Sequence, residues 1–580
     1  MMAGYDHKKE NEETDMQAAV PHRGADALIR TLTDAGVDTL FALSGNHIMP
    51  IFDACVQSGI RLIHTRHEAA TVHMADAYAR ITGKIGIALV TGGPGHANAI
   101  AALYTAGQAE SPVVLLSGHA PLTQLGMGAF QEMRQADLAA PLTKASWTAQ
   151  SAETLSQDIA RAIVVARSGR PGPVHVSLPT DVLEAHVSAL KSHAAAAFAP
   201  HPLPLDAAVA QAVVTRLRAA SRPLILTGPA SMTRTARGHA AALEHALGVP
   251  VIGMESPRGI GDPSLGAFGD MLAQSDCVLL LGKRLDFTLK FGQTPAFHRD
   301  AIVMQIDADR HELDRTQTAF GDRLTHAASA DAASAIAALL AAAEDRAPQA
   351  TTHSSPSLNP ASHAPGAKSS SWRHDVRAAI AFRPAAWDHA TSSQAGRLHP
   401  VAACRPLQAL LDSHPDSVLV VDGGEIGQWA QACLSAPHRV INGIAGSIGA
   451  ALPFAAAARV AMSDAPVVAV LGDGTFGFHS AEFDTAVRCD LPFVAVVGND
   501  ARWNAEYQIQ VRDYGQDRTI GCELLPTRYD QVAVAFGGFG AFVTAPHDMT
   551  QAVLDAQASG KPACINVMIE GLAAPNIKRA

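Results

Sequence analysis

Short apolar runs alternate with amphipathic, helix-like stretches along most of the chain. The apolar runs are rich in Val, Ile and Leu, and several end at Gly, Pro, Asp or Asn. Such alternation is typical of α/β units with parallel, doubly wound sheets. The runs that we expect to form strands are residues 39–43, 61–64, 85–90, 112–117, 173–177, 223–227, 249–252, 277–281, 302–306, 417–421, 465–471, 493–497 and 563–568.

The spacing of these runs predicts three α/β units of similar size. We place them at residues 18–190, 203–343 and 399–570. Between the second and third lies a segment, 344–398, whose first part is rich in Ala, Ser, Pro and His; we expect it to be a linker. Residues 1–17 are expected to be a disordered tail and residues 571–580 a second tail.

Composition narrows the class of protein. Hydrophobic residues make up 48% of the 580 residues and charged residues 17%, which fits large buried cores. A formal net charge of −10, without a sustained Lys/Arg stripe, argues against nucleic-acid binding. The most apolar stretch contains Pro453 and Arg459, so we expect a core helix there and no membrane contact. The N-terminus lacks a signal-peptide pattern and no CxxC pair occurs, so a cytoplasmic location is expected.

A glycine-rich turn follows one of the expected strands. Residues 472–477 read Gly-Asp-Gly-Thr-Phe-Gly, which is literally the GxGxxG pattern of dinucleotide-binding sheets. That interpretation expects an acidic residue about 20 positions later, whereas Asp500 comes 28 residues after Gly472. Asp473 and Asp500 instead follow two strands that would be neighbours, and two such oxygen donors suit Mg²⁺ bound to a diphosphate. An ordinary glycine turn remains an alternative.

An isolated glutamate starts an apolar helix-like stretch in the first unit. His67 and Glu68 resemble the start of a zinc-protease motif, but position 71, where the second histidine would stand, is Thr71. Glu68 lies after the expected strand 61–64, at the end of the sheet where ligands bind. Alone, it could simply be a helix-terminal carboxylate stabilised by the helix dipole.

Together these motifs resemble thiamine-diphosphate-dependent enzymes of the acetolactate synthase, benzaldehyde lyase and 2-hydroxyacyl-CoA lyase group. The resemblance runs from about residue 25 to residue 570 and implies a pyrimidine-binding, a central and a diphosphate-binding domain, in that order. It rests on residues 65–68, 75–80, 90–95, 128–132, 141–144, 172–174 and 472–474.

The resemblance assigns roles at the cofactor. It implies that Glu68 bonds the aminopyrimidine of thiamine diphosphate, and that Asp473, Asp500 and the backbone carbonyl of Arg502 hold Mg²⁺. The group usually has asparagine at the position of Asp500, so the second carboxylate is a departure. Ile448 matches the apolar residue that supports the bent cofactor. The further cofactor-binding positions that it implies are Gly424, Glu425, Ser447, Gly472, Gly474 and Thr475.

Two further residues point to the substrate. His47, similar to a residue of benzaldehyde lyase, could move protons to and from a hydroxyl group, although a loop histidine bonded to backbone is an alternative. Gln131 matches a glutamine shared within the group. We expect His47 and Gln131 to handle protons and the oxyanion. The segment 501–507 departs from the pattern of the group and should border the substrate pocket.

The resemblance implies a carbon–carbon lyase or carboligase that acts on 2-oxo acids, acyloins or 2-hydroxyacyl compounds through an enamine. The alternatives are an acetolactate synthase with FAD, a non-catalytic regulatory relative and, more remotely, a nicotinamide-dependent dehydrogenase. Residues 282–287 and 290–292 resemble the central domain of the acyl-CoA lyases, so FAD or an adenine nucleotide is a further possible ligand. In the group the active site is shared between chains, which implies a homodimer or homotetramer.

Overall fold

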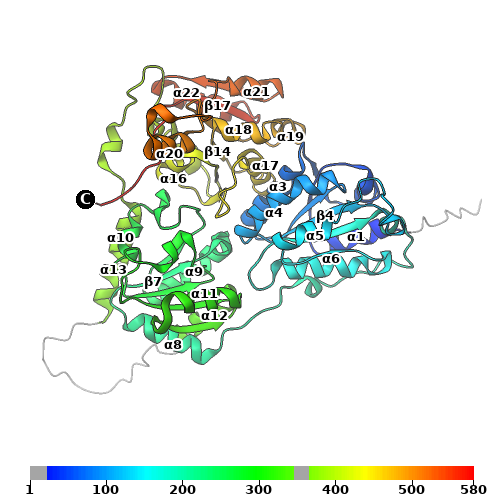
Figure 1. The fold of residues 1–580 in the computed structure, drawn as a ribbon, viewed down its shortest axis with the longest axis horizontal. Coiled ribbons are helices and arrows are strands. Elements are labelled where there is room, and N and C mark those ends of the chain that lie inside the picture. Colours follow the sequence, from blue (N-terminus) through cyan, green and yellow to red (C-terminus); the bar gives the residue numbers. More distant parts are fainter. Residues whose placement is uncertain (1–21, 345–364, 580) are drawn as a thin grey trace, which may run out of the picture.

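Three parallel sheets, each covered by helices, make up the protein. The computed structural model describes residues 22–344 and 365–579, and Figure 1 shows the three units following one another along the chain. Every strand pairing between the named strands is parallel, which confirms the predicted α/β class. The expected tail at residues 1–17 lies outside the described residues.

The first unit contains a six-stranded sheet. Its strands are β1 (Thr39–Ala42), β2 (Arg61–His64), β3 (Gly86–Val90), β4 (Val113–His119), β5 (Ser146–Thr148) and β6 (Val174–Pro179). Its helices are α1 (Gly24–Asp34), α2 (Met49–Cys55), α3 (Glu68–Thr82), α4 (Pro94–Gln108), α5 (Gln135–Ala139), α6 (Ala152–Arg167) and α7 (Thr180–Glu184).

The central unit contains a five-stranded sheet in the order β11-β10-β9-β7-β8. Its strands are β7 (Pro223–Thr227), β8 (Val251–Gly253), β9 (Cys277–Leu281), β10 (Ile302–Asp307) and β11 (Leu324–Ser329). Its helices are α8 (Ala207–Ala219), α9 (Arg234–Leu247), α10 (Phe268–Leu272), α11 (Arg310–Phe320), α12 (Ala332–Glu344) and α13 (Pro365–Ala381).

Helix α13 lies within the segment expected to be a linker, 344–398. Trp372 and Val376 of this helix are buried in the core of the central unit, and the Trp372 indole donates a hydrogen bond to the carbonyl of Pro223 at 2.9 Å. In the structure this helix therefore packs as part of the central unit. The start of the segment, residues 345–364, lies outside the described residues.

The third unit contains a second six-stranded sheet. Its strands are β12 (Val418–Val421), β13 (His438–Ile441), β14 (Val467–Gly472), β15 (Val494–Asn499), β16 (Phe539–Val543) and β17 (Ala563–Met568). Its helices are α14 (Pro400–Cys404), α15 (Leu407–Asp412), α16 (Gly424–Cys433), α17 (Ala451–Ala461), α18 (Asp473–His479), α19 (Glu482–Arg488), α20 (Asn504–Tyr514), α21 (Tyr529–Ala535) and α22 (Pro546–Ala558).

The first and third sheets share one strand order. They read β2-β1-β3-β4-β6-β5 and β13-β12-β14-β15-β17-β16, which is the same sequence of positions in both. In each, the winding reverses between the first and third strands along the chain. Doubly wound sheets bind ligands outside the carboxyl ends of the strands at such a reversal. The turns that follow β1, β3, β12 and β14 are therefore the places to look for a site.

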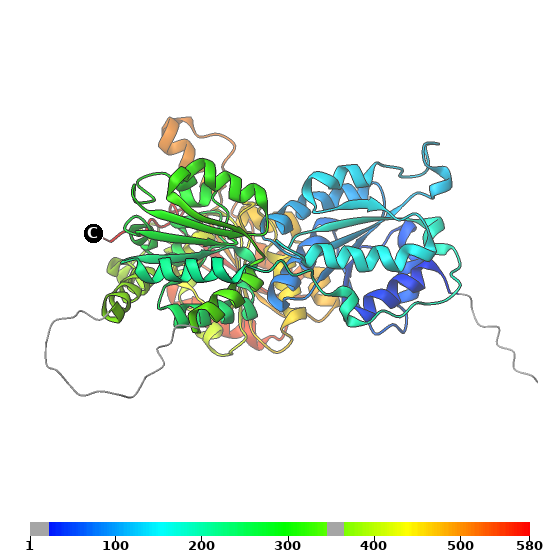
Figure 2. The same ribbon diagram turned by 90° about the horizontal axis from the view of Figure 1, so that it is seen from below.

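The first and third units share one hydrophobic core. Helix α3 contributes Ala69, Ala75 and Ala77, and α17 contributes alanines that include Ala451 and Ala455. Small side chains at a helix contact permit a close approach of the two axes. Figure 1 shows α3 and α4 beside α17, between the two sheets. The central unit instead has separate cores on the two faces of its sheet, and Figure 2 shows this sheet next to the first unit.

None of the helices within residues 22–344 and 365–579 has the length and apolar character needed to cross a membrane.

Candidate functional site

Two acidic side chains lie at the carboxyl ends of neighbouring strands of the third sheet. Asp473 follows β14 and begins α18, and Asp500 follows β15. The backbone amide of Arg502 donates to both, to Oδ2 of Asp473 at 3.2 Å and to Oδ1 of Asp500 at 3.1 Å. The structure therefore brings these two expected metal ligands together at one point.

A left-handed turn aims the Arg502 amide at this point. Ala501 has a φ of 61°, and its own amide donates to the side chain of Asn499 at 3.1 Å. Asn499 is fully buried and also donates to the carbonyl of Thr527 at 3.0 Å. Asn499 thus anchors the turn inside the unit. Of the neighbours Asn499 and Asp500, only Asp500 lines the cavity that is described below.

Both carboxyl groups are held in an environment that disfavours negative charge. Burial raises the pKa of Asp473 to about 6. Burial and the neighbouring Asp473 raise the pKa of Asp500 to about 8. A divalent cation between them would supply the missing positive charge. In the described residues no hydrogen bond reaches the carbonyl oxygen of Arg502, so this oxygen is also available as a ligand. The donor set fits the hard oxygen ligands of Mg²⁺.

A cavity opens in front of these residues. All of its lining residues belong to the third unit, and the expected position Ser447 is not among them. Of the expected cofactor-binding residues, those that line the cavity are Gly424, Glu425, Ile448, Gly472, Gly474, Thr475, Asp473, Asp500 and Arg502.

The apolar wall of the cavity depends on a tight contact. A Cβ atom on Gly423 would lie 2.3 Å from Cγ2 of Ile448, so only glycine permits the observed position of that side chain. Asp422 holds the turn in place, since its Oδ2 accepts hydrogen bonds from the amides of Gly449 at 2.8 Å and Ala451 at 3.0 Å. Our sequence reasoning missed Asp422, although an acid directly after the buried strand β12 was a usable signal.

Glu425 stands at the N-terminus of α16 and faces the same cavity. Its Oε2 is buried and has no hydrogen-bond partner among the described residues. Burial raises the pKa of this carboxyl group, and Arg258 of the central unit, 4.0 Å away, opposes the shift. An orphaned buried oxygen in a cavity wall is a position where a bound molecule would supply the missing partner.

Glu68 lies in the first unit, at the start of α3. His67 caps the helix by accepting the amide of Ala69 at 3.1 Å, and Asn98 donates to Oε2 of Glu68 at 3.0 Å. A Cβ atom on Gly95 would lie 3.3 Å from Oε1. The carboxylate therefore lies over the turn between β3 and α4 and is half-buried.

His47 lies against the same turn. Its imidazole is buried, its Nδ1 lies 3.3 Å from the hydroxyl of Thr91, and the ring stacks on Phe130 at 5.9 Å. Burial lowers the pKa of His47, with a smaller contribution from His119. The ring is therefore neutral near pH 7 and can both accept and donate a proton.

Gln131 completes this group. It has a φ of 56°, and a Cβ atom on Gly93 would lie 2.8 Å from the Gln131 Cβ. The loop that carries Gln131 is fixed by Glu132, whose carboxylate accepts the amides of Gly126 at 2.6 Å and Gly128 at 3.1 Å. Sequence reasoning did not foresee this role of Glu132.

The structure therefore contains two groups of expected residues. Glu68, His47 and Gln131 surround the turn after β3, and the two aspartates with Arg502 surround the turn after β14. Both turns lie at the reversals of their sheets. A carboxylate, a neutral imidazole and an amide can hold and move protons, while the aspartate pair can hold a metal and a diphosphate.

Family comparisons agree with this division. Three parts of the thiamine pyrophosphate enzyme family match successive segments: the N-terminal TPP binding domain at residues 22–138, the central domain at residues 210–339 and the C-terminal TPP binding domain at residues 422–567.

Curated relatives match the chain along nearly its whole length. A probable acetolactate synthase of Mycobacterium bovis is 31% identical over 576 residues, which is 96% of this chain and 97% of the relative. The human 2-hydroxyacyl-CoA lyase 2 is 30% identical over 606 residues, covering 95% of this chain and 91% of the relative. An acetolactate synthase large subunit of Parasynechococcus marenigrum is 28% identical, covering 96% of this chain and 89% of the relative.

Proposed function

Because the chain belongs to the thiamine pyrophosphate enzymes, together with acetolactate synthases and 2-hydroxyacyl-CoA lyases, we propose that it is a Mg²⁺-dependent carbon–carbon lyase or carboligase. Its substrates are 2-oxo acids, acyloins or 2-hydroxyacyl compounds. The observation that carries the proposal is the pair Asp473 and Asp500 around the Arg502 amide, at the reversal of a doubly wound sheet. Thiamine diphosphate, when bound, supplies the nucleophilic carbon and the electron sink for breaking a bond next to a carbonyl.

The chain's own residues hold the cofactor and move protons. Asp473, Asp500 and the carbonyl of Arg502 bind the metal, and Ile448 supports the cofactor from the cavity wall. Glu68 accepts a hydrogen bond from the pyrimidine end and so controls its protonation. His47 takes a proton from, or returns it to, the hydroxyl group of the substrate. Gln131 donates a hydrogen bond to the oxygen on which negative charge develops.

We further propose that the site is completed between two chains. The cavity beside Asp473 is lined by third-unit residues alone, while Glu68 lies among residues of the first unit. A homodimer in which the third unit of one chain faces the first unit of another would join them. A homotetramer would repeat this arrangement.

The boundary between the first and central units offers a second ligand position. A cavity of about 670 Å³ there is lined by cationic residues that include Lys144, Arg284 and Arg310. Its size is within the usual range for a small-molecule site, and its charge suits an adenine nucleotide or FAD. A yellow protein with a flavin spectrum would favour the acetolactate synthase alternative, which the 31% identical relative also supports.

The decisive experiment is Glu68→Gln. We expect this variant to bind thiamine diphosphate and Mg²⁺ in calorimetry, but to lose exchange of the cofactor C2 proton and all turnover. Undiminished turnover would contradict the assignment. Wild-type protein that binds no thiamine diphosphate would instead favour a regulatory relative without catalysis. Separate incubations with pyruvate, benzoin and a 2-hydroxyacyl-CoA, followed by product analysis, identify the reaction.

A further inference from the structure

A buried carboxyl group of the third unit accepts a hydrogen bond from the turn that precedes Glu68. Glu482, the first residue of α19, is 1% exposed. Its Oε1 accepts the backbone amide of Arg66 at 3.0 Å, and its Oε2 accepts the same amide at 3.3 Å. Arg66 stands two residues before Glu68. The contact therefore joins two residues that lie more than 400 positions apart in sequence. It also lies close to Glu68, the residue proposed to activate the cofactor.

Other groups hold Glu482 in this orientation. The hydroxyl of Thr485 donates to its Oε2 at 2.6 Å. Burial raises the pKa of Glu482 to about 7, whereas Thr485 and the backbone amides of Arg66 and His67 lower it. Burying a carboxyl group away from water costs free energy of folding unless its oxygens accept hydrogen bonds. Glu482 therefore makes a buried, hydrogen-bonded contact between the two units, unlike a solvent-exposed ion pair.

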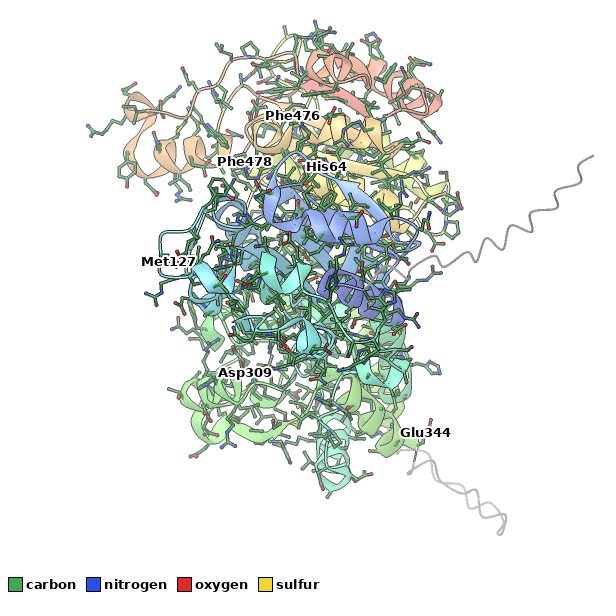
Figure 3. The ribbon with its side chains drawn as sticks, turned by 90° about the vertical axis from the view of Figure 1, so that its right-hand side faces the viewer. His64, Met127, Asp309, Glu344, Phe476 and Phe478 are labelled. Atoms are coloured by element: carbon green, nitrogen blue, oxygen red, sulfur yellow. The ribbon has the colours of Figure 1, made fainter. Side chains whose placement is uncertain are left out.

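The rest of α19 secures the strand that leads into the same turn. Arg488 donates to the carbonyl of His64, the last residue of β2, at 2.8 Å. In the reverse direction, Arg61 donates to the carbonyl of Cys489 at 3.0 Å. Figure 3 shows His64 of the first unit lying just below Phe476 of the third. The backbone from β2 to α3 is thus attached to α19 on both sides of Thr65.

We propose that Glu482 is a positioning residue for Glu68: by fixing the Arg66 amide it sets where α3 begins and where the Glu68 carboxylate points. This inference rests on the function proposed above. Helix α18, which comes just before α19 along the chain, begins at Asp473, one of the proposed metal ligands. In the proposed dimer the same short segment would therefore hold the metal of one site and the glutamate of the other.

The test is Glu482→Gln, which keeps size and shape but turns an amide group toward the backbone N–H groups. Displacement of a catalytic group by about 1 Å can cost roughly 100-fold in rate. We expect C2 proton exchange in the bound cofactor, measured by NMR after acid quench, to slow by roughly 10- to 100-fold. Calorimetry should show thiamine diphosphate and Mg²⁺ affinities within about threefold of wild type, because the metal ligands are untouched.

Asp388→Asn provides the control. Asp388 pairs with Arg405 at 2.8 Å through side chains that are both exposed. Exposed pairs of this kind contribute little, so exchange should remain at the wild-type rate. Thr485→Val, which removes only the hydroxyl bonded to Oε2, should give a smaller loss and serves if Glu482→Gln folds poorly.

A double variant separates positioning from general stability. In a Glu68→Gln background, the slow residual exchange that long incubation detects should fall no further on Glu482→Gln, because the group that it positions is gone. Wild-type exchange in Glu482→Gln, or a loss that merely follows weaker cofactor binding, would overturn the proposal. So would an equal further loss in the Glu68→Gln background. A wild-type protein that shows no cofactor binding or exchange would refute the proposed function itself, which is a different result.

Discussion

Asp500 is the residue that most distinguishes this site. It places a second carboxylate beside Asp473, and both share the Arg502 amide. Burial and the neighbouring Asp473 raise the pKa of Asp500 to about 8, which favours its neutral form when no cation lies between the two carboxyl groups. Bound Mg²⁺ would favour the charged form of Asp500 instead, because two negative ligands attract a divalent ion more strongly than one.

Replacing this residue by asparagine tests that reasoning. Asp500→Asn keeps an oxygen donor but removes one charge, so we expect Mg²⁺ affinity to fall about tenfold, because affinity follows the number of charged ligands. Calorimetric titration of Mg²⁺ in the presence of thiamine diphosphate measures it. Asp513→Asn, a change at an acid paired with Arg512 on the surface, is the control. Equal or tighter binding by Asp500→Asn would contradict the role of the second charge.

His47 separates substrate chemistry from cofactor activation. It contacts Thr91 and Phe130, and in the described part of the chain it makes no hydrogen bond with Glu68. His47→Gln should therefore leave C2 exchange unchanged and lower turnover by roughly 100-fold or more, as expected for loss of a proton-transfer group. His547→Gln, at an exposed histidine, is the control. A parallel loss of exchange and turnover would show that His47 acts on the cofactor instead.

Residue-level reasoning found side chains that the structure brings together, and it missed side chains that hold a turn in place. Asp473 and Asp500 could be found because charged residues directly follow apolar strands. Asp422 and Glu482 escaped notice because they act on backbone amides, and those partners depend on how distant turns meet in space. Ser447 was expected at the cofactor, but the residues that line the cavity do not include it.

At the scale of elements, most of the predicted strands match the structure closely. The interior strands β7, β9 and β17 have the expected bounds, and so does β2 at a sheet edge. The four strands that sequence reasoning missed, β5, β11, β13 and β16, all lie at sheet edges. Polar residues interrupt the apolar run in β5, β11 and β13, and Gly540 lies inside β16. The shared strand order of the first and third sheets depends on pairings that no local pattern encodes.

Close contacts in the turns at the strand ends set the shape of the cavity. Gly423→Ala would place a methyl group 2.3 Å from Ile448 Cγ2, so that side chain must move into the cavity. We expect thiamine diphosphate affinity to fall at least tenfold, about 1.4 kcal/mol, because the cavity wall is rebuilt. Fluorescence or calorimetric titration measures it.

Gly238→Ala is the matched control for that change. Gly238 lies in α9 of the central unit with nothing near its added methyl group. It should leave cofactor affinity unchanged and stabilise the helix by up to about 1 kcal/mol. Cofactor affinity that stays at the wild-type value in Gly423→Ala would contradict the packing argument.

At the scale of the whole molecule, the two groups of site residues make a sharp prediction about assembly. Glu68→Gln and Asp473→Asn should each be inactive alone. If sites are shared between chains, subunits that are mixed and reassembled will form hybrid dimers in which one site has both residues intact. An equal mixture should then recover about one quarter of wild-type activity. No recovery, with exchange of subunits shown by native mass spectrometry, would place each site within one chain.

The core shared by α3, α4 and α17 also has a consequence for how the protein is made. The helices of the first unit leave the ribosome roughly 370 residues before α17, which at about 5–20 residues per second is a delay of about 20 to 70 s. During this interval their alanine-rich surface has no partner within its own chain. Chains released before α17 would keep that surface exposed to water and to one another. We therefore expect the nascent chain to be most prone to aggregation until its last third has emerged.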